Sequence, residues 1–148
     1  MQDTLIIEIA LQKAEIKENS PEAELLKKCS HLNELYLGRN HFEEIIDFSG
    51  FANLQKLDLS DNKIKKIENL QSNSELKYLN ISGNEIAKIE NLESLTNLKE
   101  LNIAFNSISK IENLDSLIKL NTLKLSYNSI SKIEGLDNLL KLKMLELQ

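Results

Sequence analysis

The segment LKELNIAFN, residues 98–106, carries leucine or isoleucine at its first, fourth and sixth positions and closes with an asparagine. The same frame occurs five times, and its closing residues stand 22 apart at Asn40, Asn62, Asn84, Asn106 and Asn128. A sixth frame begins with Leu142, Leu145 and Leu147. Self-similarity at a fixed period of this length predicts a solenoid, in which every repeat forms one coil and stacks on the next.

The apolar spacing predicts the path of each coil. The Leu-x-Leu alternation is typical of a short strand whose leucines point inward, and it leaves the residues between them exposed. After each asparagine the apolar residues continue at intervals of three, as at Ile86, Ile89, Leu92 and Leu95. Such spacing favours short 3-10 or extended turns over a full α-helix. We therefore expect an α/β leucine-rich repeat solenoid with a parallel β-sheet on its concave face and tight turns on its convex face.

The five closing asparagines are expected to be structural. Each follows a strand, where its amide can bond backbone groups of its own coil and of the neighbouring coil. We interpret Asn40, Asn62, Asn84, Asn106 and Asn128 as a hydrogen-bonded ladder rather than as ligands of a partner.

The sequence divides into a cap and a repeat array. Residues 32–148 hold five full 22-residue repeats and the start of a sixth. Residues 1–31 are expected to form an N-terminal cap, because the frame recurs in degenerate form from Leu11 to Asn19. Ser20 is a good N-cap and Pro21 a good first helical residue, so a short helix to about Lys28 is predicted.

Leu145 and Leu147 should occupy inward positions of the last strand, whose outer edge would face water. An uncovered strand edge is prone to pairing with another chain. Two interpretations remain open: either the sequence is a fragment of a longer protein, or this edge pairs with another molecule.

Composition favours one domain without nucleic-acid or membrane binding. The chain has 148 residues, 41% of them hydrophobic, with 18 basic against 23 acidic side chains. The resulting net charge of −5 does not favour binding to a phosphate backbone. A single cysteine, Cys29, suits a reducing compartment. The N-terminus lacks the pattern of a signal peptide and no transmembrane run occurs, so we expect a cytoplasmic protein, with nuclear or ciliary placement also compatible.

The sequence gives little support for catalysis. His31, His41 and Cys29 lie near one another in the sequence, but no further metal ligands accompany them. The four glycines are scattered and form no phosphate-binding loop. We expect no enzyme activity, no metal and no cofactor.

The candidate binding surface is the concave face. All three tyrosines and one phenylalanine of the sequence map there, together with several acids. Exposed aromatic residues are enriched in protein interfaces, although tyrosine also favours strands for structural reasons. The predicted partner-binding residues are Glu34, Tyr36, Asp58, Tyr78, Asn80, Glu100, Asn102, Phe105, Lys124, Tyr127 and Glu146. The convex face carries columns of lysine and glutamate from Lys66 to Glu134, which we interpret as a solvated surface.

The phrase Asn-x-Ile-x-Lys-Ile-Glu-Asn-Leu, at residues 84–92 and 106–114, resembles the 22-residue subclass of leucine-rich repeats typified by the regulatory subunit of protein phosphatase 1. Axonemal dynein light chains and dynein assembly factors carry similar units. Bacterial internalins share the period, but their units resemble this phrase less closely. The resemblance implies an intracellular protein-binding module that contacts a phosphatase catalytic subunit through concave acids and aromatics. The alternatives are a ciliary or cytoskeletal scaffold that binds dynein or tubulin, and a targeting domain of a larger enzyme or effector.

Overall fold

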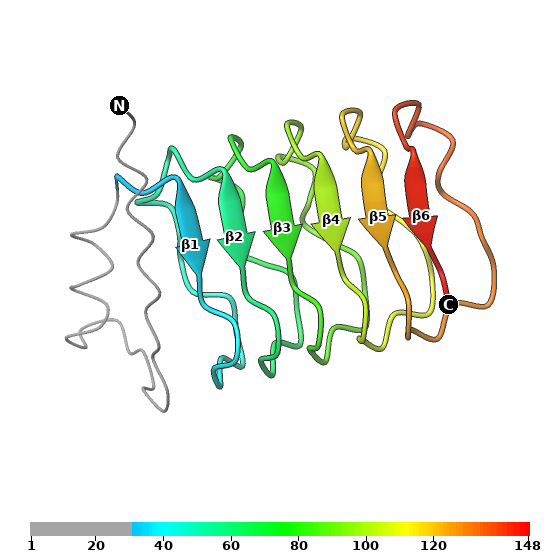
Figure 1. Cartoon of the computed structure of the whole chain (residues 1–148), viewed down its shortest axis with the longest axis horizontal. Coiled ribbons are helices and arrows are strands. Elements are labelled where there is room, and N and C mark those ends of the chain that lie inside the picture. Colours follow the sequence, from blue (N-terminus) through cyan, green and yellow to red (C-terminus); the bar gives the residue numbers. More distant parts are fainter. Residues whose placement is uncertain (1–30) are drawn as a thin grey trace.

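The computed structural model describes residues 31–148 of the chain. Within them, six strands of three residues each form one parallel sheet in the order β1-β2-β3-β4-β5-β6 (Figure 1). After each strand except the last, the chain turns and returns behind the sheet to begin the next coil (Figure 1). The strands are β1 (Glu34–Tyr36), β2 (Lys56–Asp58), β3 (Tyr78–Asn80), β4 (Glu100–Asn102), β5 (Thr122–Lys124) and β6 (Met144–Glu146).

Every strand pairs with the next at the same position of the repeat. Leu79, for example, lies between Leu57 and Leu101. No helix occurs in the described part of the chain. On the convex side the chain makes tight turns, in which the N–H of Leu95 donates to Leu92 O and the N–H of Leu98 donates to Leu95 O, both at 3.0 Å. The predicted solenoid fold is thus confirmed.

The core is one continuous apolar column along the solenoid. The central leucines of β1 to β5 are at most 1% exposed. Phe42, Phe48 and Phe51 replace the isoleucine and leucine of other repeats, and all three are buried. Phe48 and Phe51 pack edge to face with ring centroids 5.9 Å apart. At the C-terminal end Leu145 and Leu147 pack against this core but are only partly buried.

The repeated asparagines connect neighbouring coils. The side-chain Nδ2 of Asn84 donates to Ile81 O and Ser82 O of its own coil and to Leu59 O of the preceding coil, at 3.1–3.2 Å. Its Oδ1 accepts the N–H of Ile64 at 3.0 Å. The same pattern recurs at Asn62, Asn106 and Asn128.

A second asparagine ladder follows the convex side. Asn69, Asn91 and Asn113 each donate from Nδ2 to a carbonyl of the preceding coil at 2.7 Å. All three adopt left-handed backbone with φ of 57–59°, a conformation that asparagine tolerates better than most residues. Gly135 takes the same place in the next repeat with φ 69°. This ladder explains the asparagine of the Lys-Ile-Glu-Asn-Leu phrase.

Asn73 stands where later repeats have leucine, and it is fully buried. Its Nδ2 donates to Phe48 O at 3.0 Å and to Phe51 O at 3.1 Å. The buried amide therefore takes backbone partners from the preceding coil.

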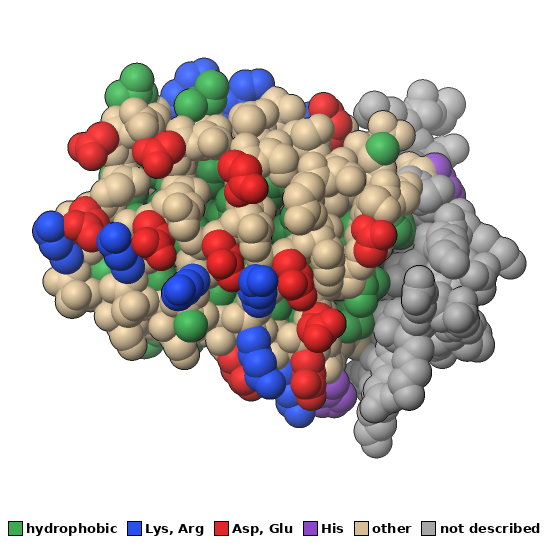
Figure 2. Space-filling model, turned by 180° about the vertical axis from the view of Figure 1, so that it is seen from behind, with side chains coloured by type: hydrophobic (Ala, Val, Ile, Leu, Met, Phe, Trp, Pro, Cys, Tyr) green, Lys and Arg blue, Asp and Glu red, His purple; other side chains and the backbone are tan. Residues whose placement is uncertain are grey.

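The convex face is covered by rows of basic and acidic side chains (Figure 2). Lys110 and Glu112 approach to 3.5 Å, and Lys132 and Glu134 to 2.7 Å. The hydrogen bond between Lys132 and Glu134 raises the pKa of the lysine and lowers that of the glutamate. Both groups are exposed to solvent, so the pair contributes little to stability.

Two expectations lie outside the described residues: the N-terminal cap over residues 1–31, of which only the last residue is described, and the short helix that begins at Pro21. In residues 31–148 the structure contains no helix long and apolar enough to cross a membrane.

Candidate protein-binding face

The sheet presents its alternate residues on the concave side. In each of β1 to β5 the central leucine is buried, whereas the residues before and after it are partly or fully exposed. In-register pairing aligns these outward residues in two rows. One row holds Glu34, Lys56, Tyr78, Glu100, Thr122 and Met144, and the other holds Tyr36, Asp58, Asn80, Asn102, Lys124 and Glu146.

Both lysines of these rows are engaged by neighbouring side chains. Lys124 Nζ lies between two carboxylates, 3.8 Å from Glu100 and 3.9 Å from Glu146. Lys56 Nζ lies 5.0 Å from the ring centroid of Tyr36. The pKa of Lys56 is raised above its ordinary value, chiefly by hydrogen bonding to the hydroxyl of Tyr36, and partial burial acts in the opposite direction. The two rows contain four acidic residues and two lysines, and both lysines already contact neighbouring side chains. The concave sheet therefore carries a net negative charge.

A polar hydrogen-bonded run crosses the middle of the sheet. Asn80 Nδ2 donates to Asp58 Oδ2 at 3.0 Å, and the hydroxyl of Ser60 donates to Asp58 Oδ1 at 2.6 Å. Asp58 and Asn80 line a shallow hollow of about 260 Å³ that Tyr78 and Glu100 also line. Tyr78 is 41% exposed, so its ring is available to a partner.

A third line of side chains follows the strand exits. It comprises Arg39, Asp61, Gly83, Phe105 and Tyr127, and every one of them has a positive φ between 53° and 66°. The rings of Phe105 and Tyr127 stack with centroids 4.2 Å apart and planes inclined by 12°. Even so, Phe105 is 56% exposed and Tyr127 66% exposed. Large side chains rarely occupy left-handed backbone, which costs roughly 1–2 kcal/mol per residue.

The conformation of Phe105 allows a test of whether its ring serves stability. Replacing Phe105 with asparagine should change the free energy of unfolding by less than about 1 kcal/mol. The loss of stacking on Tyr127 is offset by the better fit of asparagine to left-handed backbone. Urea denaturation followed by circular dichroism measures the difference, and a loss above about 2 kcal/mol would assign the ring to structural support.

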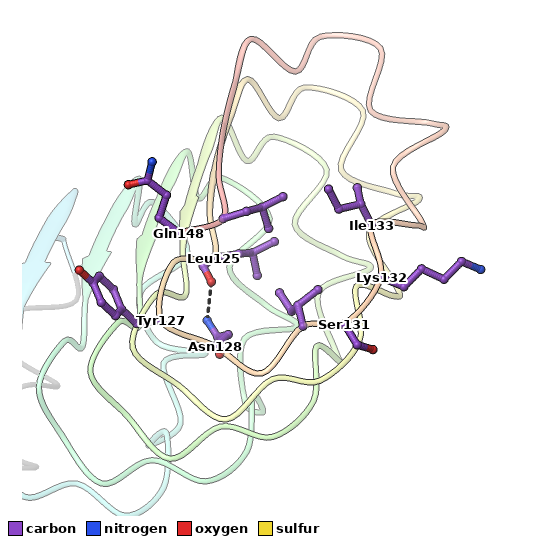
Figure 3. Close-up of a pocket in the computed structure, with 9 residues that line it drawn as sticks. Leu125, Tyr127, Asn128, Ser131, Lys132, Ile133 and Gln148 are labelled. Atoms are coloured by element: carbon purple, nitrogen blue, oxygen red, sulfur yellow. Dashed lines mark hydrogen bonds between the residues drawn. The ribbon is translucent and has the colours of Figure 1, made fainter.

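The far side of the last coil forms a separate hollow of about 420 Å³, lined by Leu125, Ile130, Ile133 and Leu147 among others. Figure 3 shows that Tyr127 points away from Ile133 and Lys132, while Asn128 bonds to Leu125 O at 2.9 Å. In earlier repeats the corresponding surface is covered by the following coil. This hollow is therefore the stacking surface of a coil, distinct from the concave face.

All predicted partner-binding residues lie on the concave side or at its strand-exit border. The sequence did not predict the stacking of Phe105 on Tyr127 or the bridging of two acids by Lys124. Phe105 and Tyr127 are separated by one repeat of 22 residues, and this spacing is the signal that could have predicted their stacking. Among residues 31–148, no group of three or more histidine, cysteine, aspartate or glutamate side chains is arranged to hold a metal ion.

Comparisons with known proteins agree with the fold. A model of paired leucine-rich repeats matches residues 52–94 and 74–116, and a second leucine-rich repeat model matches residues 20–64. The chain belongs to the leucine-rich repeat family. None of the curated proteins matches it significantly.

Several solved structures are similar to the chain. An internalin C2 from Listeria monocytogenes is 31% identical with a TM-score of 0.77, over 83% of this chain and 54% of that one. An internalin (InlF) from the same organism is 28% identical with a TM-score of 0.76, over 83% of this chain and 37% of that one. TLR13 in its complex with ssRNA13 is 32% identical with a TM-score of 0.72, over 79% of this chain and 19% of that one. The chain thus spans about half or less of the length of these proteins.

Leucine-rich repeat proteins are generally interaction modules, and the fold is typically a scaffold without catalytic activity. These matches establish the class of protein and leave its partner undetermined.

Proposed function

We propose that this chain is a protein-binding module whose concave face, with the strand-exit aromatics, holds the partner. The exposed stack of Phe105 on Tyr127 carries the proposal. Two large rings are held at the surface on a backbone conformation that disfavours them, so stability alone does not account for their presence. Large aromatic side chains are among those that contribute most to the affinity of protein interfaces.

The partner class that best fits the sequence is a protein phosphatase catalytic subunit. This proposal rests on the resemblance of the repeat phrase to the phosphatase regulatory subclass and on the acidic, aromatic composition of the concave rows. Asp58, Glu100 and Glu146 would supply the acids, and Tyr78 the aromatic ring between them. Asn80, Asn102 and Lys124 interrupt the acidic row, so the match to that subclass is partial.

A direct binding measurement tests the proposal. The purified chain is immobilised and titrated with protein phosphatase 1 catalytic subunit by biolayer interferometry. A variant with Tyr78→Ala, Phe105→Asn and Tyr127→Asn should raise Kd at least about tenfold, because each anchor contributes on the order of 1 kcal/mol or more. A matched convex variant with Lys88→Ala, Glu90→Ala and Lys110→Ala should bind as the wild type does.

Parallel capture from a cell lysate, followed by mass spectrometry, separates the remaining alternatives. If the phosphatase does not bind but dynein or tubulin is captured by the wild type and lost with the concave variant, the scaffold function replaces the phosphatase one. If binding is lost only with the convex variant, the concave face is not the binding surface.

A further inference from the structure

The line of strand-exit side chains is interrupted at Gly83. The N–H groups of Asp61, Gly83 and Phe105 each donate to the following coil, at 2.9, 3.0 and 2.8 Å. The three residues therefore follow one another along the solenoid at intervals of one strand spacing, about 4.8 Å. Because glycine has no side chain, a gap remains between the side chains of Asp61 and Phe105. We call this gap the Gly83 slot.

One wall of the slot is the free face of Phe105. The ring of Phe105 stacks on Tyr127 of the next coil at 4.2 Å, with nearly parallel planes. The two rings are thus stacked along the solenoid, and the opposite face of Phe105 turns toward Gly83. Tyr127 supports the ring from behind and holds its face toward the slot.

The other wall is the carboxylate of Asp61. A Cβ added to Gly83 would meet Oδ1 of Asp61 before any other atom, so this oxygen leans over the glycine. The second oxygen, Oδ2, faces the opposite way and lies 3.7 Å from Nε of Arg39. One carboxylate oxygen thus already faces a guanidinium of the chain itself, while the other faces the slot.

These two walls fit a planar cation. The backbones of Asp61 and Phe105 are two strand spacings apart, roughly 10 Å, but Asp61 Oδ1 leans over Gly83, so this oxygen and the Phe105 ring are separated by about one strand spacing, roughly 5 Å. A guanidinium is attracted to a ring within about 6 Å of its centroid and pairs with a carboxylate at up to about 4 Å. Its flat shape allows both contacts at once, whereas an ammonium makes weaker use of the ring. A nucleic-acid base could also stack on Phe105, but its phosphates would face Asp61 and the acidic sheet.

The geometry points to an arginine-binding subsite: the Gly83 slot receives an arginine side chain of the protein partner, which stacks on Phe105 and pairs with Asp61 Oδ1. This inference rests on the proposed protein-binding function and adds the chemical class of one side chain that the partner must present.

Two-dimensional NMR of the ¹⁵N-labelled chain tests the slot with defined probes. The peptides are acetyl-Gly-Arg-Gly-amide, its lysine counterpart, and its citrulline counterpart, which has nearly the same shape as arginine but no charge. The arginine peptide should shift the amide signals of Gly83 and Phe105, with Kd on the order of 10 mM for a single side chain. The lysine and citrulline peptides should cause shifts several-fold smaller at equal concentration.

Variants assign the effect to its two walls. Asp61→Asn and Phe105→Asn should each reduce the response to a fixed arginine peptide concentration about fivefold, the factor expected from loss of one exposed ion pair or cation–π contact. Tyr78→Ala is the matched control, since it removes an exposed concave ring outside the slot and should leave the response unchanged. Arg39→Ala should maintain or increase the response, because the resident cation is removed from the same carboxylate.

Equal shifts from all three peptides, or full retention of the response in both wall variants, would overturn the slot. A response lost with Tyr78→Ala would likewise place the arginine elsewhere. Neither result bears on the binding of the phosphatase or of lysate proteins to the concave face, so failure of the slot and failure of the proposed function are separately visible. The slot is supported if only the arginine peptide shifts the signals and only proteins that retain both Asp61 and Phe105 respond.

Discussion

Replacing Leu101 with alanine should lower the free energy of unfolding by about 2–5 kcal/mol. Leu101 is fully buried at the centre of β4, between Leu79 of one coil and Leu123 of the next. A solenoid is stabilised by interfaces between neighbouring coils, so a cavity at this position weakens two interfaces together. Urea denaturation monitored by circular dichroism measures the loss.

The matched control for Leu101 is Leu140, which is 89% exposed. Leu140→Ala removes the same atoms from a surface position, and it should change the free energy of unfolding by less than about 0.5 kcal/mol. Equal effects of the two substitutions would contradict the assignment of Leu101 to the core. A second contradiction would be a loss below about 1 kcal/mol for Leu101→Ala with an unchanged denaturant slope.

The repeat frame predicts the fold in detail because its period fixes the register. Once residues 22 apart stack, Leu57, Leu79 and Leu101 must form one column and the residues beside them must face outward. Likewise Phe42, Phe48 and Phe51 could be assigned to the core because they replace apolar residues at known offsets. Short strands of this kind would be hard to predict from local preference alone, whereas repetition identifies them.

Features that depend on the backbone conformation outside the strands were harder to predict from the sequence. Nothing in the identity of Phe105 or Tyr127 indicates a left-handed backbone, because these residue types seldom adopt it. The convex asparagines at 69, 91 and 113 could have been recognised, since Gly135 replaces asparagine at the same position and both residue types favour positive φ.

The candidate site could be predicted as a surface but not as a set of contacts. The alternation within each strand places the outward residues correctly. By contrast, the position of Lys124 between Glu100 and Glu146 depends on side-chain reach across three strands. The Gly83 slot likewise depends on the direction in which Asp61 leans, and a sequence pattern contains no information on that direction.

The second large effect is expected at the asparagine ladder. Asn84→Ala should lower the free energy of unfolding by about 2–5 kcal/mol, although it removes few atoms and little apolar surface. Its Nδ2 serves three carbonyl oxygens in two coils, and its Oδ1 accepts the N–H of Ile64. Alanine leaves that buried N–H without its partner, and an unsatisfied buried donor costs about 1–3 kcal/mol.

Aspartate at the same position separates the hydrogen bonds from packing. Asn84→Asp preserves the shape and the acceptor, but the ionised carboxylate would face the carbonyl oxygens of Leu59 and Ile81 in place of a donor. The pKa of this carboxyl should therefore be raised in the folded protein, and the protonated form is the one that the fold tolerates. The stability difference from wild type should be smallest below the unfolded pKa of about 3.9 and should widen as pH rises toward 7.

Denaturation of wild type, Asn84→Ala and Asn84→Asp at about pH 3 and pH 7 measures both effects. Asn97→Ala is the matched control, since Asn97 also bonds a carbonyl of the preceding coil but at an exposed position, and it should cost less than about 1 kcal/mol. If Asn84→Ala costs no more than Asn97→Ala, the coils are held together by apolar stacking alone. If the loss of stability in Asn84→Asp does not depend on pH, the carboxylate at this position does not face the carbonyl oxygens of Leu59 and Ile81. The side chain would then be more accessible to solvent than the hydrogen bonds of Asn84 indicate.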